Sequence, residues 1–240
     1  MRPVAKRVAV LRHDAVDHLG VGDQVLRGEG LDIEYVDLWS GMPIPQAHDH
    51  DAFVILGGEM NADETQRYPF LLGERELILQ CAAESVPMLG ICLGGQVMAR
   101  AFDARVSAGD SREAAFLPIH PTPAARDDPL LCVYRDGDRV LRWHEDAFAV
   151  PSGGVLLLEG DPVAPNQGFR MGERSWGVQF HPELTKELFE AWLGMVGDHL
   201  ERHWGRTPVE LRADVAEHLP AHQARSRELF RRFVEIVRGS

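Results

Sequence analysis

A cysteine between glycines is the strongest chemical signal in the sequence. Cys92 stands in the stretch Gly90-Ile91-Cys92-Leu93-Gly94-Gly95-Gln96, which follows an apolar run and precedes a helical pattern. A nucleophile elbow is a strained turn from strand to helix, and it needs small residues two positions before and two positions after the nucleophile. The amino terminus of the following helix stabilises a thiolate. The pattern therefore favours a nucleophilic Cys92 over a buried structural cysteine.

A second motif supplies the base that a nucleophilic cysteine needs. In Gly177-Val178-Gln179-Phe180-His181-Pro182-Glu183, a predicted strand delivers His181 at its carboxyl end, and Pro182 stops the strand. Two residues further on, Glu183 can reach back to the imidazole and fix its tautomer. A loop histidine with a structural role is the alternative, since the chain has 11 histidines.

Two adjacent glycines in Leu56-Gly57-Gly58-Glu59-Met60 follow another predicted strand. Glycines at this place let a backbone N–H project into the crevice above the sheet. Such an N–H is suited to form an oxyanion hole with the N–H of Leu93, the residue after the nucleophile. A tight turn without a chemical role is the alternative.

Together the three motifs resemble the class I (triad-type) glutamine amidotransferases, in the order that this family has them. The resemblance covers roughly residues 5–195 and implies that Cys92 is the nucleophile, His181 the base and Glu183 the orienting acid. It also implies an oxyanion hole at Gly58 and Leu93, and contacts to the glutamine substrate from Gln96, Gly57, Trp143 and His144. Tyr68-Pro69-Phe70 also matches the family pattern. Residues 166–170 resemble the stretch that precedes the histidine strand in relatives of the GMP synthase amidotransferase domain.

Three residues depart from the family pattern. Glu59 stands where many relatives have proline, Gly95 where His, Met or Ala is frequent, and Glu145 where glycine is common. None of these changes removes a triad member, so they concern the choice of substrate. A carboxylate at Glu59, near the expected mouth of the crevice, would favour a cationic or amine-bearing substrate. A solvated loop acid is the alternative.

The elements that must position these residues follow a βαβ rhythm. Short apolar runs predict buried strands of a parallel sheet covered on both faces, at residues 8–11, 33–38, 53–56 and 87–91. Helical spacing covers residues 70–85 and begins again at residues 96–102. We therefore predict an α/β fold with a doubly wound, mostly parallel sheet. The family resemblance implies the flavodoxin-like class I glutamine amidotransferase version of that fold.

Residues 104–181 have a different texture and predict an antiparallel elaboration of the same domain. Strand-like pieces lie between Gly, Pro and Asp turns, at residues 114–119, 131–134, 140–143, 155–158 and 176–180. Residues 135–138 predict a hairpin turn. His13, in a loop at the carboxyl end of the first strand, lines the pocket or has a plain loop role.

The chain becomes helical after His181. Residues 185–200 predict one helix, and two amphipathic segments follow at residues 208–219 and 221–237. Arg225, Arg227, Arg231 and Arg232 predict a basic, solvated face on the last segment. We expect a catalytic domain at residues 1–195 and a helical extension at residues 196–240 that packs on the same domain.

Composition and charge exclude several classes of protein. The 240 residues are 45% hydrophobic and 26% charged, as in ordinary globular proteins, and no apolar run reaches the roughly 18 residues of a membrane span. A net charge of −12 opposes binding to nucleic acid or to an anionic membrane. Three cysteines without close spacing indicate a reducing cytoplasm, with Cys81 and Cys132 in the core.

No cofactor or metal is expected. The sequence has no Walker loop, no Gly-x-Gly-x-x-Gly fingerprint and no Cys-x-x-Cys pair. His48-Asp49-His50 has residue types that bind metals, but neighbouring side chains in a Pro-rich loop alternate in direction.

The resemblance implies a stand-alone cysteine hydrolase that cleaves the γ-glutamyl amide of glutamine through a γ-glutamyl thioester and releases ammonia and glutamate. A separate synthetase subunit could accept the ammonia, and a homo-oligomer is open. One alternative is a γ-glutamyl peptidase or hydrolase that acts on small γ-glutamyl conjugates. Another is a non-catalytic regulatory subunit that keeps the fold.

Overall fold

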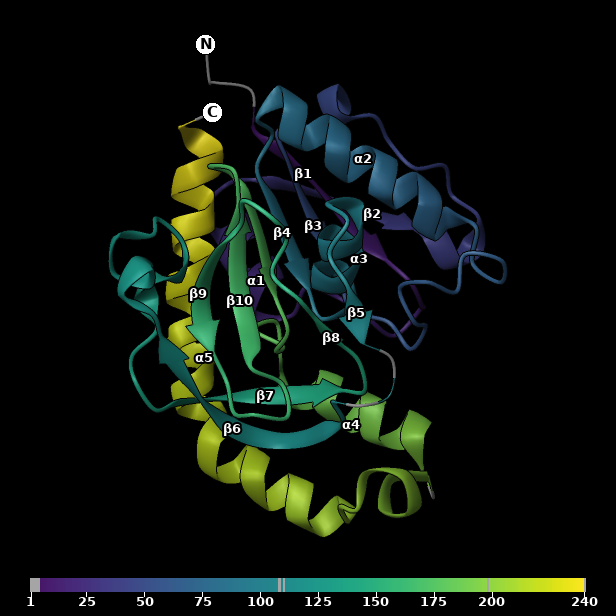
Figure 1. Cartoon of the computed structure of the whole chain (residues 1–240), viewed down its shortest axis with the longest axis vertical. Coiled ribbons are helices and arrows are strands. Elements are labelled where there is room, and N and C mark those ends of the chain that lie inside the picture. Colours follow the sequence, from purple (N-terminus) through teal and green to yellow (C-terminus); the bar gives the residue numbers. More distant parts are fainter. Residues whose placement is uncertain (1–4, 108, 110, 198, 240) are drawn as a thin grey trace.

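A nine-stranded sheet runs through the middle of the molecule (Figure 1). The computed structural model describes residues 5–107, 109, 111–197 and 199–239. Five neighbouring strands are parallel, in the order β2 (Asp32–Asp37), β1 (Arg7–Arg12), β3 (Ala52–Ile55), β4 (Met88–Ile91) and β11 (Ser175–Val178). The carboxyl ends of parallel strands share one edge, so the loops after β1, β3, β4 and β11 meet there.

Four antiparallel strands extend the sheet beyond β11. They are β10 (Asn166–Met171), β9 (Val155–Glu159), β6 (Glu113–Pro121) and β7 (Asp138–His144). A separate two-stranded sheet pairs β5 (Val106–Ser107) with β8 (Ala147–Phe148). The predicted α/β class with a large, mostly parallel sheet and an antiparallel elaboration is confirmed.

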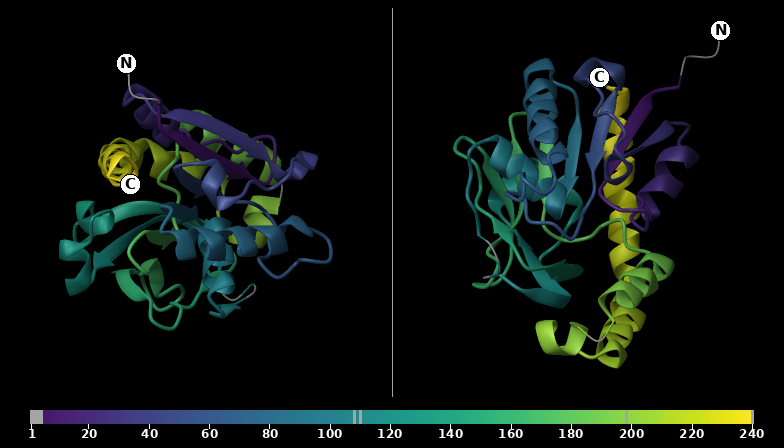
Figure 2. Two further views of the ribbon diagram at one scale, coloured as in Figure 1. Left: turned by 90° about the horizontal axis from the view of Figure 1, so that it is seen from above. Right: turned by 90° about the vertical axis from the view of Figure 1, so that its right-hand side faces the viewer.

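Helices cover both faces of the sheet (Figure 2). Val8 and Val10 of β1 point into a core shared with α1 (Val21–Gly28) and α5 (Pro208–Arg238). Ala9 and Leu11 point into the opposite core, under α2 (Phe70–Glu84) and α3 (Leu93–Ala101). Because successive side chains of a strand face opposite sides, an uninterrupted apolar run is what a sheet buried on both faces requires.

A third apolar cluster joins the β6–β7 hairpin to the carboxyl-terminal helices. It contains Trp143 of β7, Phe189 of α4 (Lys186–Val196) and Leu200 of a π-helical turn (Leu200–Trp204). Thr185 caps α4 by accepting a hydrogen bond from the N–H of Leu188, at 3.1 Å. This cluster attaches the end of the chain to the hairpin that carries the Trp-His-Glu-Asp motif.

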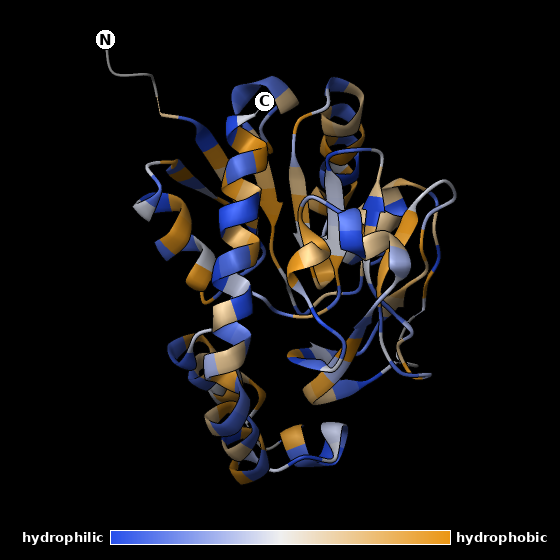
Figure 3. Ribbon diagram, turned by 90° about the vertical axis from the view of Figure 1, so that its left-hand side faces the viewer, coloured by the Kyte–Doolittle hydropathy of each residue, from blue (hydrophilic) through white to orange (hydrophobic). Residues whose placement is uncertain are grey.

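The two predicted carboxyl-terminal helices are one helix, α5, and the prediction of two was wrong. Thr207 and Glu210 form a capping box at its start, and Pro220 lies inside it. A proline inside a helix lowers the stability of the helix by about 3 kcal/mol. The helix stays continuous because apolar residues on the two sides of Pro220 are buried in two different clusters. Figure 3 shows polar and apolar residues alternating along α5. Arg225 is not simply solvated, because it pairs with Asp138 at 2.8 Å.

The prediction of a strand at residues 131–134 was also wrong. This stretch forms a 3-10 helix, Leu131–Val133, because Asp128 Oδ1 accepts hydrogen bonds from the N–H groups of Leu130 and Leu131 and fixes a helical turn. Cys132 on this turn is only partly buried, whereas Cys81 is in the core as predicted. A turn is present at residues 135–138, with the N–H of Asp138 bonded to the carbonyl of Arg135, but it is not the predicted hairpin turn, because a 3-10 helix and not a strand precedes it, and β7 pairs with β6.

No helix within the described ranges is both long and apolar enough to cross a membrane.

Substitution of Phe230 tests whether α5 is part of the hydrophobic core. Its ring is fully buried in the cluster beneath the sheet. We expect Phe230→Ala to lower the free energy of unfolding by about 3–5 kcal/mol in urea titrations, because the substitution leaves a cavity. Val209 is 75% exposed at the start of the same helix, so Val209→Ala should change it by less than about 0.5 kcal/mol. Equal effects of the two variants would contradict this placement.

Candidate active site

Cys92 occupies a strained turn between β4 and α3. Its φ and ψ angles are 52° and −109°, a region that residues other than glycine rarely adopt. The N–H of Cys92 donates to the carbonyl of Val178 at 2.8 Å, which ties the turn to the end of β11. A Cβ at Gly94 would lie 2.1 Å from the carbonyl oxygen of Ile55, so only glycine fits there. This is the elbow geometry that the sequence predicts.

His181 and Glu183 form a buried ion pair beside this turn. His181 Nδ1 lies 2.8 Å from Glu183 Oε1, and both side chains are almost inaccessible to solvent. Burial by itself would lower the pKa of His181, but the charges of Glu183 and Cys92 outweigh it and raise the pKa well above its usual range. The ring is therefore held in its protonated form.

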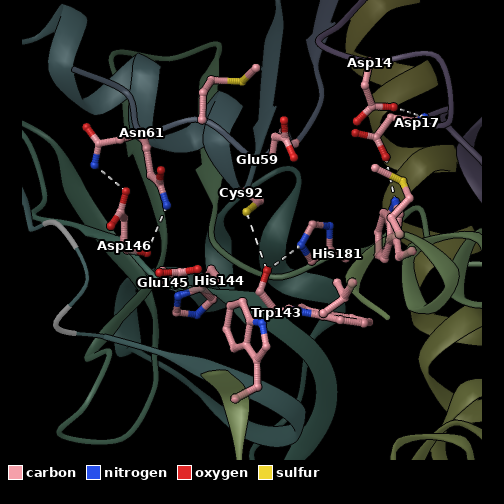
Figure 4. Close-up of a pocket in the computed structure, with 18 of the residues that line it drawn as sticks. Asp14, Asp17, Glu59, Asn61, Cys92, Trp143, His144, Glu145, Asp146 and His181 are labelled. Carbon is pink, nitrogen blue, oxygen red and sulfur yellow. Dashed lines mark hydrogen bonds between the residues drawn. The ribbon is translucent and has the colours of Figure 1, made fainter. Parts of the chain in front are cut away.

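Cys92 and His181 converge on one main-chain carbonyl, as Figure 4 shows. His181 Nε2 donates to the carbonyl oxygen of Trp143 at 3.3 Å, and Cys92 Sγ lies 4.0 Å from the same oxygen. Gln179 Nε2 lies 3.7 Å from Cys92 Sγ. We did not identify Gln179 from the sequence, although its position two residues before His181 puts both side chains on one side of an extended segment.

The Gly57-Gly58 pair lies directly against the cysteine and the histidine. A Cβ at Gly57 would lie 3.3 Å from His181 Cε1 and 3.7 Å from Cys92 Cβ, so glycine keeps this side of the site open. Leu93 is the first residue of α3, and its N–H has no acceptor within the helix. In the part of the chain that the structure describes, we find no hydrogen bond from the N–H of Gly58 or Leu93.

The residues expected to contact substrate line the same cavity. Gln96 Nε2 donates to the carbonyl of Asp146 at 2.9 Å. His144 is 4% exposed, and its Nε2 lies 3.0 Å from Glu113 Oε2. His144 Nδ1 has no hydrogen-bond partner among the described residues, so this ring nitrogen is available to a ligand.

The cavity at the carboxyl edge of the sheet has a volume of about 820 Å³. Its walls include many carboxylates and, among the described residues that line it, no lysine or arginine. The lining residues are Asp14, Asp17, Gly57, Gly58, Glu59, Met60, Asn61, Glu64, Cys92, Gln96, Gly109, Trp143, His144, Glu145, Asp146, His181, Trp192, Met195, Val196, His199, His203 and Trp204.

The carboxyl-terminal segment forms one wall of this cavity, which we did not foresee from the sequence. Trp192 packs edge-on against His181, with ring centroids 4.7 Å apart. Trp204 packs against Trp143 at 6.3 Å, and His203 Nε2 lies 2.8 Å from Glu145 Oε1. Residues beyond 195 therefore contribute to the cavity, while the division into a domain and an extension stays a prediction.

Asp17 is a second unforeseen residue, in the loop after β1. It is 6% exposed, and its Oδ1 accepts a hydrogen bond from Trp192 Nε1 at 2.7 Å. Burial, the charge of Asp14 and the more distant charge of Glu183 raise the pKa of Asp17 to about 7. The loop at the carboxyl end of a strand was the available signal.

His13 lies behind the glycine pair rather than on the cavity wall. Its Nδ1 donates to the carbonyl of Gly57 at 2.7 Å, and its Nε2 lies 3.0 Å from Glu74 Oε1. Burial lowers the pKa of His13, but the charge and hydrogen bond of Glu74 and the contact with Gly57 raise it overall. The sequence left two roles open for His13, a place in the pocket wall and a plain loop role, and the structure supports neither of them.

The His48-Asp49-His50 stretch lies outside the cavity lining. Its first two residues belong to a 3-10 helix, Ala47–Asp49, and His50 Nε2 lies 2.9 Å from Glu34 Oε2. Across the described ranges, no group of three or more His, Cys, Asp or Glu side chains is arranged to hold a metal ion.

The fold and this arrangement define a class of protein, and comparison with known proteins identifies it. The family model of class I glutamine amidotransferases matches residues 23–193, so the chain belongs to that family. It is similar to the glutamine amidotransferase-like protein YfeJ of Salmonella typhimurium, with 27% identity over 188 residues, 77% of this chain and 78% of that protein.

Other relatives are connected with GMP synthesis. One of them, from Halobacterium salinarum, is by name a single component of the glutamine-hydrolysing GMP synthase. It is 31% identical over 151 residues, 62% of this chain and 75% of that component. The GMP synthase of Porphyromonas gingivalis is 38% identical over 100 residues, but the match covers 41% of this chain and only 19% of that protein.

Solved structures share the fold over almost the whole chain. A glutamine amidotransferase from Thermotoga maritima superposes with a TM-score of 0.86 and 26% identity, and covers 98% of this chain and 99% of its own. One from Methylobacillus flagellatus, at 22% identity, has the same TM-score over 97% and 96% of the two chains. The likeness extends over most of the chain beyond residue 193, where the family model's match ends.

The raised pKa of Asp17 predicts a pH dependence of stability. Its value of about 7 exceeds the ordinary 3.8, so the folded state binds this proton more tightly than the unfolded state does. The protonated Asp17 therefore stabilises the folded state at low pH, and this stabilisation is lost as the pH rises from about 4 to about 7. Asp17→Asn keeps an acceptor for Trp192 but does not titrate. We expect its unfolding free energy, relative to the parent, to rise across this window and then level off.

Urea titrations at several pH values measure this difference. Each pKa unit corresponds to about 1.4 kcal/mol, so an effect of this size is readily detected. Glu159→Gln is the control, because Glu159 is exposed and lies outside the cavity lining. A difference between Asp17→Asn and the parent that stays constant with pH would show that Asp17 does not titrate in this range.

Proposed function

We propose that the chain hydrolyses the γ-glutamyl amide bond of glutamine by a Cys92–His181–Glu183 triad. The observation that carries this proposal is the strained turn at Cys92 beside a buried His181–Glu183 pair. Family membership supports it at the coarser level of a glutamine amidotransferase.

The first half of the reaction forms a thioester. His181 already holds the proton that Cys92 and His181 share, and the Cys92 sulfur attacks the side-chain carbonyl carbon of the substrate. The N–H groups of Gly58 and Leu93 stabilise the negative oxygen of the tetrahedral intermediate. His181 then gives its proton to the departing nitrogen, the C–N bond breaks and ammonia leaves.

The second half releases glutamate. His181 takes a proton from a water molecule, which attacks the thioester carbonyl carbon. The C–S bond breaks, and the cysteine recovers as thiolate beside the imidazolium. Glu183 keeps the ring oriented through Nδ1 and compensates its charge in both halves.

The remaining predicted residues hold the γ-glutamyl group. Gly57 lies against the cysteine, and Gln96, Trp143 and His144 line the same cavity. His144 Nδ1 is suited to contact the α-carboxylate of the substrate, because it is buried at the cavity and has no hydrogen-bond partner among the described residues. No cofactor takes part in this proposal.

A partner protein would enter the proposed function as the acceptor of the ammonia. The Halobacterium relative is by name one component of a GMP synthase, and it supports a separate synthetase as acceptor. Release without transfer, by a free-standing enzyme, is the simpler case and the one we propose. All three cysteines are free, which suits the cytoplasmic location that we propose.

A γ-glutamyl hydrolase acting on small conjugates is the second candidate. The cavity of about 820 Å³ favours it, because pockets for ligands of drug size have volumes of about 300–1,000 Å³. Glutamine needs only a small part of that space.

Labelling of Cys92 tests the proposed function. A diazoketone analogue of glutamine should alkylate Cys92 alone, as mass spectrometry of the protein will show, and Cys92→Ala should remain unlabelled. We expect Cys92→Ala to abolish glutamate release, and His181→Ala to reduce it by at least about 10³-fold. Cys81→Ala is the control, since that thiol is buried away from the cavity. Neither label nor glutamate, with or without candidate synthetase partners, would favour a non-catalytic role.

A further inference from the structure

Two carboxylates lie side by side at one end of the cavity, Asp14 and Asp17 (Figure 4), and Glu59 also lines it. No lysine or arginine is among the described lining residues. The guanidinium of Arg12, in the preceding strand, is paired with Asp37 and donates to the main-chain carbonyl of Asp17 at 3.1 Å, so it stands behind the pair and not in the cavity lining. Two adjacent carboxylates, one of them buried, repel each other unless a proton or a cation lies between them.

The position of this pair relative to the reacting atoms indicates what it would bind. His181 protonates the departing nitrogen, so the leaving group must lie on the His181 side of the thiol. Figure 4 shows Asp14 and Asp17 on that side of Cys92, with Asn61 and Asp146 on the other. The pair thus lies where the leaving group would extend.

The opposite end of the cavity gives independent evidence of a ligand. His144 is 4% exposed and lines the cavity, yet its Nδ1 has no partner among the described residues. A buried ring nitrogen of this kind is normally hydrogen-bonded. The cavity therefore offers an unpartnered ring nitrogen for the glutamyl part of a substrate at one end, and two carboxylates for a cationic group at the other.

We propose that γ-glutamyl amides of diamines or polyamines are substrates of this site in addition to glutamine, with Asp14 and Asp17 binding the second, charged amine. This proposal rests on the triad chemistry above and deepens it. Cys92 displaces the amine from the γ-carbonyl, and the C–N bond breaks as His181 supplies its proton. Water then cleaves the C–S bond, so the products are glutamate and the free diamine, without an oxidant or other reactant.

A matched pair of substrates tests this proposal with the full chain. γ-Glutamylputrescine and γ-glutamylpentylamide differ only by a terminal ammonium in place of a methyl group, and glutamine is assayed beside them. We expect kcat/KM to be at least about tenfold higher for the putrescine conjugate, because a hydrogen bond to a charged group contributes that much. Asp14→Asn and Asp17→Asn should each bring the ratio of the two conjugates towards one. Glu159→Gln, which removes a carboxylate elsewhere, should leave it unchanged.

The outcomes separate this proposal from the proposed function. If glutamine is hydrolysed but the two conjugates react equally, or if both Asn variants keep the preference, the proposal is wrong and the triad stands. If no γ-glutamyl compound is cleaved, the triad function fails. Calorimetry of the two conjugates with Cys92→Ala then still measures the charge preference, and equal affinities would overturn the proposal. Because Asp14 and Asp17 are tested separately, one misfolded variant does not remove the test.

A second inference concerns the buried His13–Glu74 pair, which the triad chemistry does not use. Both side chains are fully buried, and His13 Nδ1 holds the carbonyl of Gly57 at 2.7 Å. In a trans peptide the carbonyl and the following N–H point in opposite directions. Holding the Gly57 carbonyl therefore directs the N–H of Gly58 away from His13.

The neighbours of Gly58 leave little room for a side chain. A Cβ at Gly58 would lie 2.8 Å from Met60 Sδ, 2.9 Å from Leu93 Cδ2 and 3.0 Å from His13 Cβ, so these side chains would have to shift. Glycine on its own is free to rotate. We infer that His13, fixed by Glu74, is a positioning residue that keeps the Gly58 N–H aimed at the substrate oxyanion.

Two variants of matched size test this role. In a Glu74→Gln background, which avoids an unpaired buried charge, His13→Asn retains a donor for the Gly57 carbonyl and His13→Leu does not. We expect His13→Leu to lower kcat for the best substrate by about tenfold or more, with KM nearly unchanged, since an oxyanion hole acts on the transition state. His13→Asn should recover most of kcat.

A structural role would give a different result. Equal kcat values for the Asn and Leu variants, or a change confined to KM, would overturn the inference. Binding of a γ-glutamyl aldehyde, which forms a tetrahedral adduct with Cys92, provides a second measurement. Its affinity should fall with kcat in His13→Leu, and an unchanged affinity would count against the role.

Discussion

The strained turn at Cys92 is the constraint on which the rest of the site depends. A residue other than glycine with φ of 52° persists only where its surroundings fix it. Here the N–H of Cys92 bonds to Val178 and the N–H of Gly94 bonds to Leu56, so the turn is held from β11 on one side and β3 on the other. The same two attachments bring the His181 loop and the Gly57-Gly58 pair against the thiol.

Two buried histidine–carboxylate pairs support this turn from different sides. In the first pair, His181 contacts Glu183 and the carbonyl of Trp143. In the second pair, His13 contacts Glu74 and the carbonyl of Gly57. In each, one ring nitrogen faces a carboxylate and the other a main-chain carbonyl. A buried charge is tolerated only when it is paired and hydrogen-bonded, so each pair also fixes a segment of backbone at the edge of the cavity.

Prediction from the sequence was most accurate where a local pattern is sufficient. Parallel strands buried on both faces are uninterrupted apolar runs, and the elbow at Cys92 needs its glycines at fixed spacing. It was inaccurate where other contacts overrode the residue pattern. Residues 131–134 have strand-like composition, but the nearby side chain of Asp128 accepts hydrogen bonds from the backbone and turns it into a 3-10 helix. Pro220 suggested a break in α5, but packing in two clusters keeps the helix continuous.

The sequence by itself determined the α/β class, the elbow and the identity of the expected triad residues, because each depends on residues close together in the chain. Only the tertiary structure decided what else surrounds them. Asp17 on Trp192 and His13 behind Gly57 join segments far apart in the sequence. No local pattern encodes such contacts, since they arise only when the parallel strands and the carboxyl-terminal helices are packed together.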